Sequence, residues 1–166
     1  MNTPLQEKIY DQWLSEHRAI LFKVVRAYAF GPEDQEDLFQ EIALQLWKSV
    51  PGFQAHSAVT TWIYRVALNT ALKWSGKQRH QKGSSTDPEV LLPTSAYENE
   101  QVAWLYEQIA RLSKVDRSLI ILMLDGFSYR EIAGIAGISE SNVGVKIHRI
   151  KKQLAQASKT GTHYEI

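Results

Sequence analysis

Residues 127 to 152 read FSYREIAGIAGISESNVGVKIHRIKK, and this stretch predicts two short helices joined by a tight turn. Ser128 can cap the first helix, while Glu131 three residues later reaches back to the Ser128 amide, which is the pattern of a capping box. Gly137 supplies the permissive backbone of a turn, and Ser139 can cap the second helix. The stretch therefore predicts a helix-turn-helix.

The second of these helices, expected to extend to about Gln153, has two contrasting faces. A stripe predicted to pack on the partner helices consists of Val143, Ile147, Ile150 and Leu154. The other side has no acid between Ser141 and Lys159 and carries several cations, which would attract DNA phosphates. An ordinary surface helix with a solvated basic side is the alternative, but cap, turn and basic face together favour DNA binding. The candidate duplex-binding residues are Ser141, Gly144, Val145, Lys146, His148, Arg149 and Lys152.

Composition narrows the class of protein. The chain has no cysteine, which excludes a disulfide framework and any thiolate metal site. Its histidines are scattered, and it has no nucleophile motif, phosphate-binding glycine loop or clustered metal ligands, so we expect no cofactor, no metal and no enzymatic activity. The amino terminus lacks the pattern of a signal peptide and no apolar run has the length of a membrane span, so we expect a cytoplasmic protein without membrane insertion.

Helical periodicity dominates the 166 residues and predicts an all-α fold of two small domains joined by a flexible linker. We expect one helix or a helix pair over 5–30, and single helices over 33–50, 58–77, 97–112 and 114–124. The glycine- and serine-containing segment from Gly83 indicates the linker. The predicted organisation is an amino-terminal domain over 1–80, a linker over 81–95, a carboxy-terminal helix-turn-helix domain over 96–158 and a tail over 159–166.

Charge is segregated in the amino-terminal half, although the net charge is only +1. Acids crowd between Glu33 and Glu41, whereas none occurs between Ile42 and Thr86. On the predicted second helix, Asp37, Gln40, Glu41 and Leu44 share a mixed stripe opposite the apolar arc. This stripe is either plain solvated surface or a protein-docking face, in which the leucine is the anchor and the carboxylates select a basic partner.

The predicted third helix carries aromatic and cationic residues in alternation. Its outward edge is expected to hold Arg65, Leu68, Asn69, Leu72 and Arg79. Lys73 and Lys77 lie on the same helix, and the loop before it holds Phe53, His56 and Ser57. Such a set can grip unpaired bases, since rings stack, amides read base edges and cations hold the backbone. The alternative is that Trp62, Tyr64 and Trp74 are core aromatics, which we prefer for Trp74 and Trp62.

These motifs together resemble a bacterial RNA polymerase sigma factor of the extracytoplasmic-function group of the sigma-70 family. The residues that carry the resemblance are Asp37-Leu38-Phe39-Gln40-Glu41 with Trp47, Phe53, Thr61 to Asn69, Ser128 to Ala133, and Val143 to Arg149, in that order along nearly the whole chain. The resemblance implies that the protein binds core RNA polymerase and directs promoter-specific initiation.

The resemblance also assigns a role to each candidate site. It implies that Asp37, Gln40, Glu41 and Leu44 dock on the clamp helices of the largest polymerase subunit, and that the carboxy-terminal domain meets the flap of the second-largest subunit. Phe53, His56, Ser57, Arg65, Asn69, Lys73, Lys77 and Arg79 would recognise and melt the minus-ten element as single-stranded DNA. The helix-turn-helix would bind the minus-thirty-five element as a duplex, and an anti-sigma factor or another recruiting protein is an implied partner.

The sequence departs from the family pattern at several positions. Gly144 and Val145 stand where a basic residue and a serine are usual, and Asn142 stands where threonine is frequent. Contacts to base edges would then be made mainly by His148 and Arg149 instead of these positions, and Val145 could contact the methyl group of a thymine. Leu68 stands where an arginine is common, which removes one expected phosphate contact.

A competing class is a helix-turn-helix regulator that binds duplex DNA independently of polymerase. The chain has no heptad seam for dimerisation and no sensor signature. Binding to core RNA polymerase distinguishes the two classes.

Overall fold

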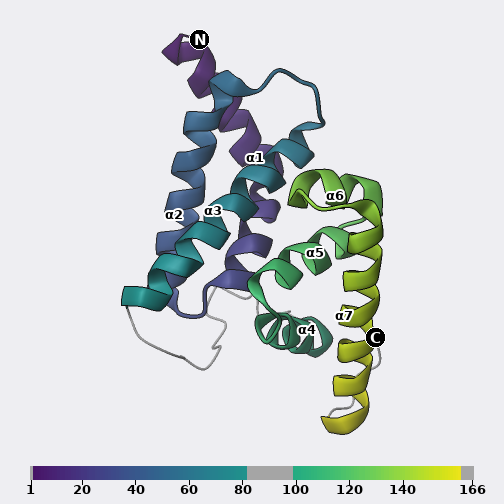
Figure 1. Cartoon of the computed structure of the whole chain (residues 1–166). Coiled ribbons are helices and arrows are strands. Elements are labelled where there is room, and N and C mark those ends of the chain that lie inside the picture. Colours follow the sequence, from purple (N-terminus) through teal and green to yellow (C-terminus); the bar gives the residue numbers. More distant parts are fainter. Residues whose placement is uncertain (1, 82–98, 162–166) are drawn as a thin grey trace. The chain divides into compact units, whose positions relative to one another are not determined.

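The computed structural model describes residues 2–81 and 99–161, and within these ranges it contains α-helices, one short 3-10 helix and no strand (Figure 1). The expected all-α fold is confirmed. The helices are α1 (Thr3–Tyr28), α2 (Pro32–Ser49), α3 (Val59–Gln81), α4 (Glu100–Ala110), α5 (Lys114–Leu124), α6 (Tyr129–Ala136) and α7 (Glu140–Gly161), with the 3-10 turn η1 (Val50–Gly52) after α2. The chain divides into two compact units, Met1–Leu92 and Pro93–Ile166. The predicted linker, from residue 82 onward, and residues 162–166 of the predicted tail lie outside the described residues.

Two helices differ from the sequence prediction in ways that have a local cause. Helix α1 is interrupted at His17, whose φ of −125° and ψ of 22° are not helical, so the alternative of a helix pair describes it better than one straight helix. Helix α7 does not stop near Gln153 but continues to Gly161. The residues in between include alanine, glutamine and lysine and contain no glycine or proline, so nothing in that segment terminates a helix.

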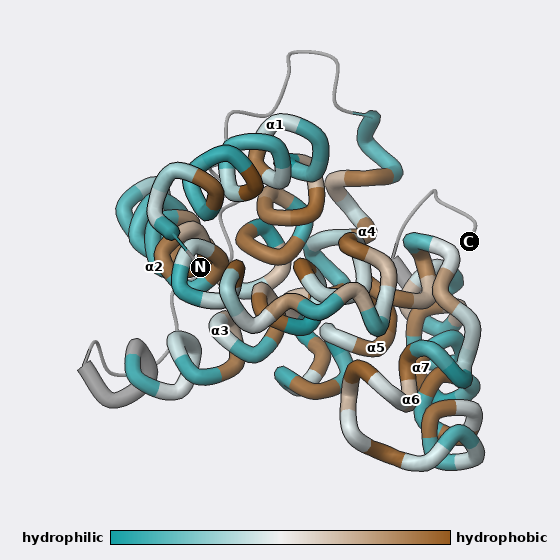
Figure 2. The backbone as a smooth tube through the Cα atoms, turned by 90° about the horizontal axis from the view of Figure 1, so that it is seen from above, coloured by the Kyte–Doolittle hydropathy of each residue, from teal (hydrophilic) through white to brown (hydrophobic). Residues whose placement is uncertain are grey.

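The first unit is a bundle in which α1, α2 and α3 all contact one another. Each helix buries one side, and hydrophobic and hydrophilic residues accordingly alternate along the chain in Figure 2. Tyr10 joins α1 to α2, because its hydroxyl donates to the Ala43 carbonyl oxygen at 3.0 Å. Burial, and to a lesser extent the Asp11 charge, raises the pKa of Tyr10, so the phenol keeps the proton that it donates. The fully buried side chains of this core include Leu21, Val24, Leu38, Ile42, Leu46, Ile63 and Tyr64.

The expected position of Leu68 was wrong. The sequence predicts Leu68 on the outward edge of the third helix, but its side chain is only 3% exposed and belongs to the core. Helix α3 packs against both α1 and α2, so its buried arc is wider than the single stripe that the pattern predicted. Leu68 is therefore not a surface position at which a phosphate-binding arginine has been lost.

The second unit consists of α4 to α7. Ser113 caps α5 by accepting a hydrogen bond from the Asp116 amide, and the Arg117 guanidinium on α5 donates to the carbonyl oxygens of Ala110 and Leu112 at the end of α4. Helices α5, α6 and α7 all contact one another. Their shared core contains Leu119, Ile120, Leu122, Ile132, Val143, Ile147, Ile150 and Leu154, which confirms the predicted stripe of α7.

The predicted helix-turn-helix is confirmed in its local details. The Glu131 amide donates to the Ser128 hydroxyl at 3.1 Å and the Ser128 amide donates to the Glu131 carboxylate at 2.9 Å, which completes the capping box. Gly137 ends α6 with a φ of +74°, a left-handed conformation that glycine adopts without strain. Ser139 caps α7 by accepting from the Asn142 amide. These contacts fix the turn that presents α7.

Candidate nucleic-acid interface

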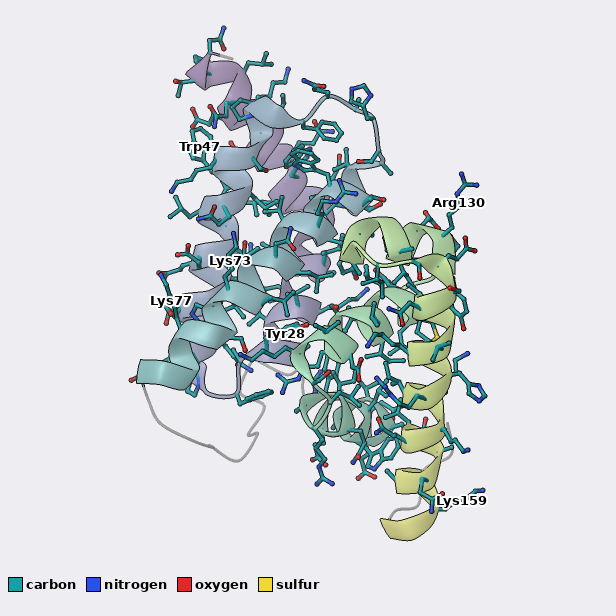
Figure 3. All side chains as sticks on the ribbon, viewed as in Figure 1. Tyr28, Trp47, Lys73, Lys77, Arg130 and Lys159 are labelled. Atoms are coloured by element: carbon teal, nitrogen blue, oxygen red, sulfur yellow. The ribbon has the colours of Figure 1, made fainter. Side chains whose placement is uncertain are left out.

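A groove between α2 and α3 joins two sets of residues that the sequence assigned to different partners. Its volume is about 650 Å³. Two of the predicted docking residues, Asp37 and Glu41, lie on the α2 wall, and three of the predicted strand-gripping residues lie on the α3 wall. Lys73 and Lys77 are one turn apart on α3 (Figure 3). The groove is lined by Asp37, Glu41, Gln45, Lys48 and Ser49 on one side and by Val66, Asn69, Thr70, Lys73, Trp74 and Lys77 on the other.

A hydrogen bond crosses this groove. The indole nitrogen Nε1 of Trp74 donates to Oδ2 of Asp37 at 2.7 Å, and Trp74 itself is 8% exposed. Trp74 is therefore a core aromatic, as we preferred from the sequence. The bond holds the Asp37 carboxylate against α3. Glu41 is half-buried on the same wall, and its carboxylate accepts a hydrogen bond from the Gln45 side-chain amide at 3.1 Å.

The cations of the groove are available to an external anion. Lys48, Lys73 and Lys77 are exposed, and none of them forms an ion pair within 4.0 Å with a carboxylate of the described residues. Asn69 on the same helix is exposed as well, whereas Arg65 is half-buried. The side chain of Arg79 lies outside the described residues. Helix α3 thus presents an amide between cations, an arrangement suited to a nucleic-acid strand.

The remaining docking residues lie on the exposed part of α2. Leu44 is 45% exposed, and Gln40 is exposed with its amide nitrogen near the Glu36 carboxylate at 3.4 Å. An exposed leucine between polar side chains has the composition of a small protein-binding anchor. The predicted mixed stripe is therefore accessible to a partner, since three of its four side chains are exposed and the fourth, Glu41, is half-buried.

The loop before α3 is attached to the core by aromatic rings. The Phe53 ring lies between those of Trp13 and Trp62, with edge-on contacts at centroid distances of 5.5 Å and 5.4 Å. The indole nitrogen of Trp62 donates to the Ser49 hydroxyl at 3.1 Å, and Trp13 from α1 is buried. Phe53, expected to contact DNA, is thus engaged within the protein. Trp13 was missed because it lies forty residues earlier in the chain and has no local signal.

The tip of this loop has a constrained backbone. Ala55 has a φ of +58°, a left-handed conformation that is costly for a residue with a Cβ atom. On either side of it the Gln54 Oε1 and His56 Nε2 atoms are 3.0 Å apart, and both side chains are exposed. Ser57 is half-buried. The loop is therefore held from below by the aromatic cluster and presents Gln54 and His56 outward; Gln54 was not among the predicted site residues.

The outer face of α7 carries the predicted duplex-binding residues in the expected orientation. Ser141, Val145, His148, Arg149 and Lys152 are exposed, and Gly144 and Lys146 are half-buried. The sequence did not reveal that Arg149 has a partner within the protein. Its guanidinium NH2 group lies 3.2 Å and 3.4 Å from the two carboxylate oxygens of Asp116 on α5. The Asp116 side chain is only 10% exposed, whereas that of Arg149 is 52% exposed.

Comparison with known proteins agrees with both halves of this arrangement. Residues 13–81 match the family described as Sigma-70 region 2, and residues 103–154 match the family described as Sigma-70, region 4. RNA polymerase sigma factor YlaC of Bacillus subtilis is 28% identical over 157 residues, which are 89% of this chain and 88% of that protein. The ECF RNA polymerase sigma-E factor of Escherichia coli is 28% identical over 137 residues, 73% of this chain and 72% of that protein. The chain belongs to the extracytoplasmic-function group of sigma-70 factors.

The fold of this sigma factor is also that of solved relatives. The structure of the sigma factor RpoE of Bartonella quintana, in complex with the anti-sigma factor NepR, superposes with a TM-score of 0.73 at 19% identity, over 94% of this chain and 99% of that chain. CnrH in complex with the cytosolic domain of CnrY superposes with a TM-score of 0.66 at 17% identity, over 94% and 91% of the two chains. At these identities the likeness shows the fold.

Family membership settles the general role. The protein is a sigma factor of transcription initiation, which decides against the regulator that binds duplex DNA independently of polymerase. The first unit contains region 2 and the second contains region 4. None of the helices in the described ranges combines the length and the apolar character needed to cross a lipid bilayer.

Proposed function

We propose that this sigma factor docks on the clamp helices of core RNA polymerase through the α2 stripe, opens the minus-ten element with the loop before α3 and with α3 itself, and binds the minus-thirty-five duplex with α7. The observation that carries the first two roles is the groove between α2 and α3. Its carboxylates, Asp37 and Glu41, lie on the α2 wall, and Lys73 and Lys77, which form no ion pair with the described carboxylates, lie on the α3 wall. Polymerase and DNA would therefore meet the protein on adjacent surfaces.

The docking role follows from the exposed stripe of Asp37, Gln40, Glu41 and Leu44. Leu44 supplies an apolar anchor, 45% exposed in the free protein, and the neighbouring acids select a basic partner surface. Because Trp74 holds Asp37 in place, that carboxylate loses little side-chain freedom on binding. Glu41 lies one helical turn further on the same face. The region 4 unit would meet the flap of the second-largest subunit.

The melting role requires no covalent chemistry. Extruding a base from the stack costs a few kcal/mol, which contacts to the separated strand recover. The loop tip presents Gln54 and His56 on a backbone that the aromatic cluster keeps in place, so little order is lost when a base binds. Asn69 can then contact a base edge while Lys73 and Lys77 hold phosphates of the non-template strand. Phe53 supports the loop instead of stacking on a base.

The upstream role rests on the geometry of the helix-turn-helix. The capping box and the left-handed Gly137 fix α6 against α7, and the exposed face of α7 carries cations and small polar side chains suited to a major groove. Carrying both readers on one polymerase-bound chain raises the effective concentration of each at the promoter. The two solved relatives are structures of complexes with partner proteins, one of them an anti-sigma factor, and we propose a protein of that class as a further partner.

The test separates polymerase binding from promoter opening. Glu41→Lys should lower association with core polymerase, because it reverses a charge on the docking wall. The double substitution Lys73→Ala, Lys77→Ala should leave association unchanged and reduce permanganate reactivity of the minus-ten thymines. Matched controls outside the groove are Glu33→Lys, in the first turn of α2, and Lys8→Ala, on α1, both exposed. If the lysine pair weakened polymerase association as much as Glu41→Lys does, the division of roles between the two walls would be wrong.

A further inference from the structure

The basic face of α7 contains an apolar spot that the packing of the protein does not explain. Val145 is 67% exposed, more than any other large hydrophobic side chain in the described ranges. Beside it in the chain, Gly144 faces the ring of Tyr129 from α6: a Cβ atom added at Gly144 would lie 3.7 Å from that ring. Tyr129 is itself 37% exposed. An exposed valine thus directly follows the glycine that faces this ring, on a helix face that is otherwise polar and cationic.

The charges around this spot indicate the chemistry of its partner. His148 and Lys152 are on the same side of α7 as Val145, one and two turns further, and Lys151 is also exposed. Cations around an apolar centre suit a partner with phosphates at its rim and an apolar group inside it. A DNA major groove has this form where it contains thymine, the one ordinary base that presents a methyl group there.

We propose that Val145 is a specificity-determining residue of this sigma factor, which reads the 5-methyl group of a thymine in the upstream element, next to the Tyr129 ring. This inference rests on the proposed binding of the upstream duplex by α7. It also follows from what the neighbouring positions lack: Gly144 has no side chain to offer a base, and the Arg149 guanidinium already has the Asp116 carboxylate as a partner. An apolar contact by Val145 is therefore a readout that these two neighbouring positions do not replace.

The expected size of the effect follows from the chemistry of one methyl group. Burying one such group changes affinity about fourfold. Replacing thymine by deoxyuridine removes the methyl group and leaves every hydrogen-bonding atom of the base in place. Affinity for a duplex with uracil at the contacted position should therefore fall about fourfold, and at the other thymines it should not change.

The experiment uses the full chain in reconstituted holoenzyme. Promoters are first selected from random DNA, and each thymine of the selected upstream element is then replaced singly by deoxyuridine. Wild-type holoenzyme should lose affinity at one thymine position. Holoenzyme with Val145→Ala should bind the thymine duplex more weakly and should no longer distinguish thymine from uracil there. Val115→Ala is the matched control, because Val115 on α5 is 45% exposed and has no place in the proposed interface.

The outcomes separate this inference from the proposed function. If an upstream element is selected but no uracil substitution matters, or if Val145→Ala keeps the full uracil penalty, the methyl readout is overturned while upstream binding stands. If no upstream element is selected and Lys152→Ala leaves promoter affinity unchanged, the proposed role of α7 itself fails. Loss of uracil discrimination in Val145→Ala, with discrimination retained in Val115→Ala, supports the inference.

Discussion

The ion pair between Arg149 and Asp116 leads to an asymmetric prediction for stability. Arg149→Met removes the guanidinium but keeps the aliphatic stem, and it leaves the Asp116 carboxylate without a partner while only 10% of that side chain is exposed. Removing one partner of a fully buried pair costs about 3–5 kcal/mol, and because this pair reaches the surface we expect about 2–3 kcal/mol. Asp116→Asn leaves Arg149, 52% exposed, to be solvated by water, so we expect a loss of about 1 kcal/mol.

The five tryptophans provide an assay that distinguishes the two units. Trp104 is the one tryptophan of the second unit and is 5% exposed, so in protein labelled with 5-fluorotryptophan its fluorine resonance reports the unfolding of that unit. Arg149→Met should lower the midpoint of the Trp104 transition by roughly 10 °C or more, given about 4–8 °C per kcal/mol for a unit of this size. The four tryptophans of the first unit should be unaffected.

A double-mutant cycle decides whether the asymmetry has this cause. In the variant that carries both Asp116→Asn and Arg149→Met, no buried charge is left unpaired, so the loss should be smaller than the sum of the single losses by at least about 1 kcal/mol. Strictly additive losses, or a larger loss for Asp116→Asn than for Arg149→Met, would refute the reasoning. The result also bears on DNA binding, because unfolding of the second unit would by itself weaken the footprint on the upstream element. A weaker footprint of an Arg149 variant therefore indicates a lost DNA contact only under conditions where the Trp104 resonance is that of the folded unit.

Three further predictions concern single side chains. Hydrogen bonds from Ser128 lower the pKa of Glu131 in the folded protein. The stability that this carboxylate contributes is therefore present above its unfolded pKa of about 4.3 and is lost as the pH falls through its lower folded pKa. Glu131→Gln should flatten this acid dependence of thermal unfolding. Gly137→Ala should destabilise the second unit by about 1 kcal/mol because of the positive φ, whereas Gly134→Ala, inside α6 with open space around it, should stabilise it by a similar amount. Trp74→Phe should cost about 1–2 kcal/mol in urea unfolding, since it removes a hydrogen bond to a carboxylate, and Trp47→Phe, whose indole nitrogen has no partner in the described ranges, should cost less.

Each of these has a contradicting outcome. An unchanged acid limb in Glu131→Gln would show that the capping carboxylate does not carry the pH dependence. Shifts of the same sign in the two glycine variants would contradict the backbone argument, because only one of the two positions has a left-handed conformation. Equal losses in the two tryptophan variants would mean that the ring volume matters and the hydrogen bond does not.

Local interactions explain why much of the fold could be predicted. The capping box spans four residues, the turn at Gly137 depends on one backbone conformation, and each buried stripe repeats every three or four positions. The same local reasoning placed Val145, His148 and Lys152 correctly on the exposed face of α7. It failed for Leu68, since the width of a buried arc depends on how many helices pack against it.

The sequence by itself determined the helices, their caps and the charge of each exposed face, because these depend on atoms within one or two turns of the chain. Tertiary structure alone decided which faces became neighbours. It paired Trp74 with Asp37 and Arg149 with Asp116, separated by 37 and 33 positions, and it placed Phe53 between two tryptophans. Such contacts depend on the angle and distance at which helices pack, which arise from the fit of whole side-chain surfaces and leave no periodic mark in the sequence.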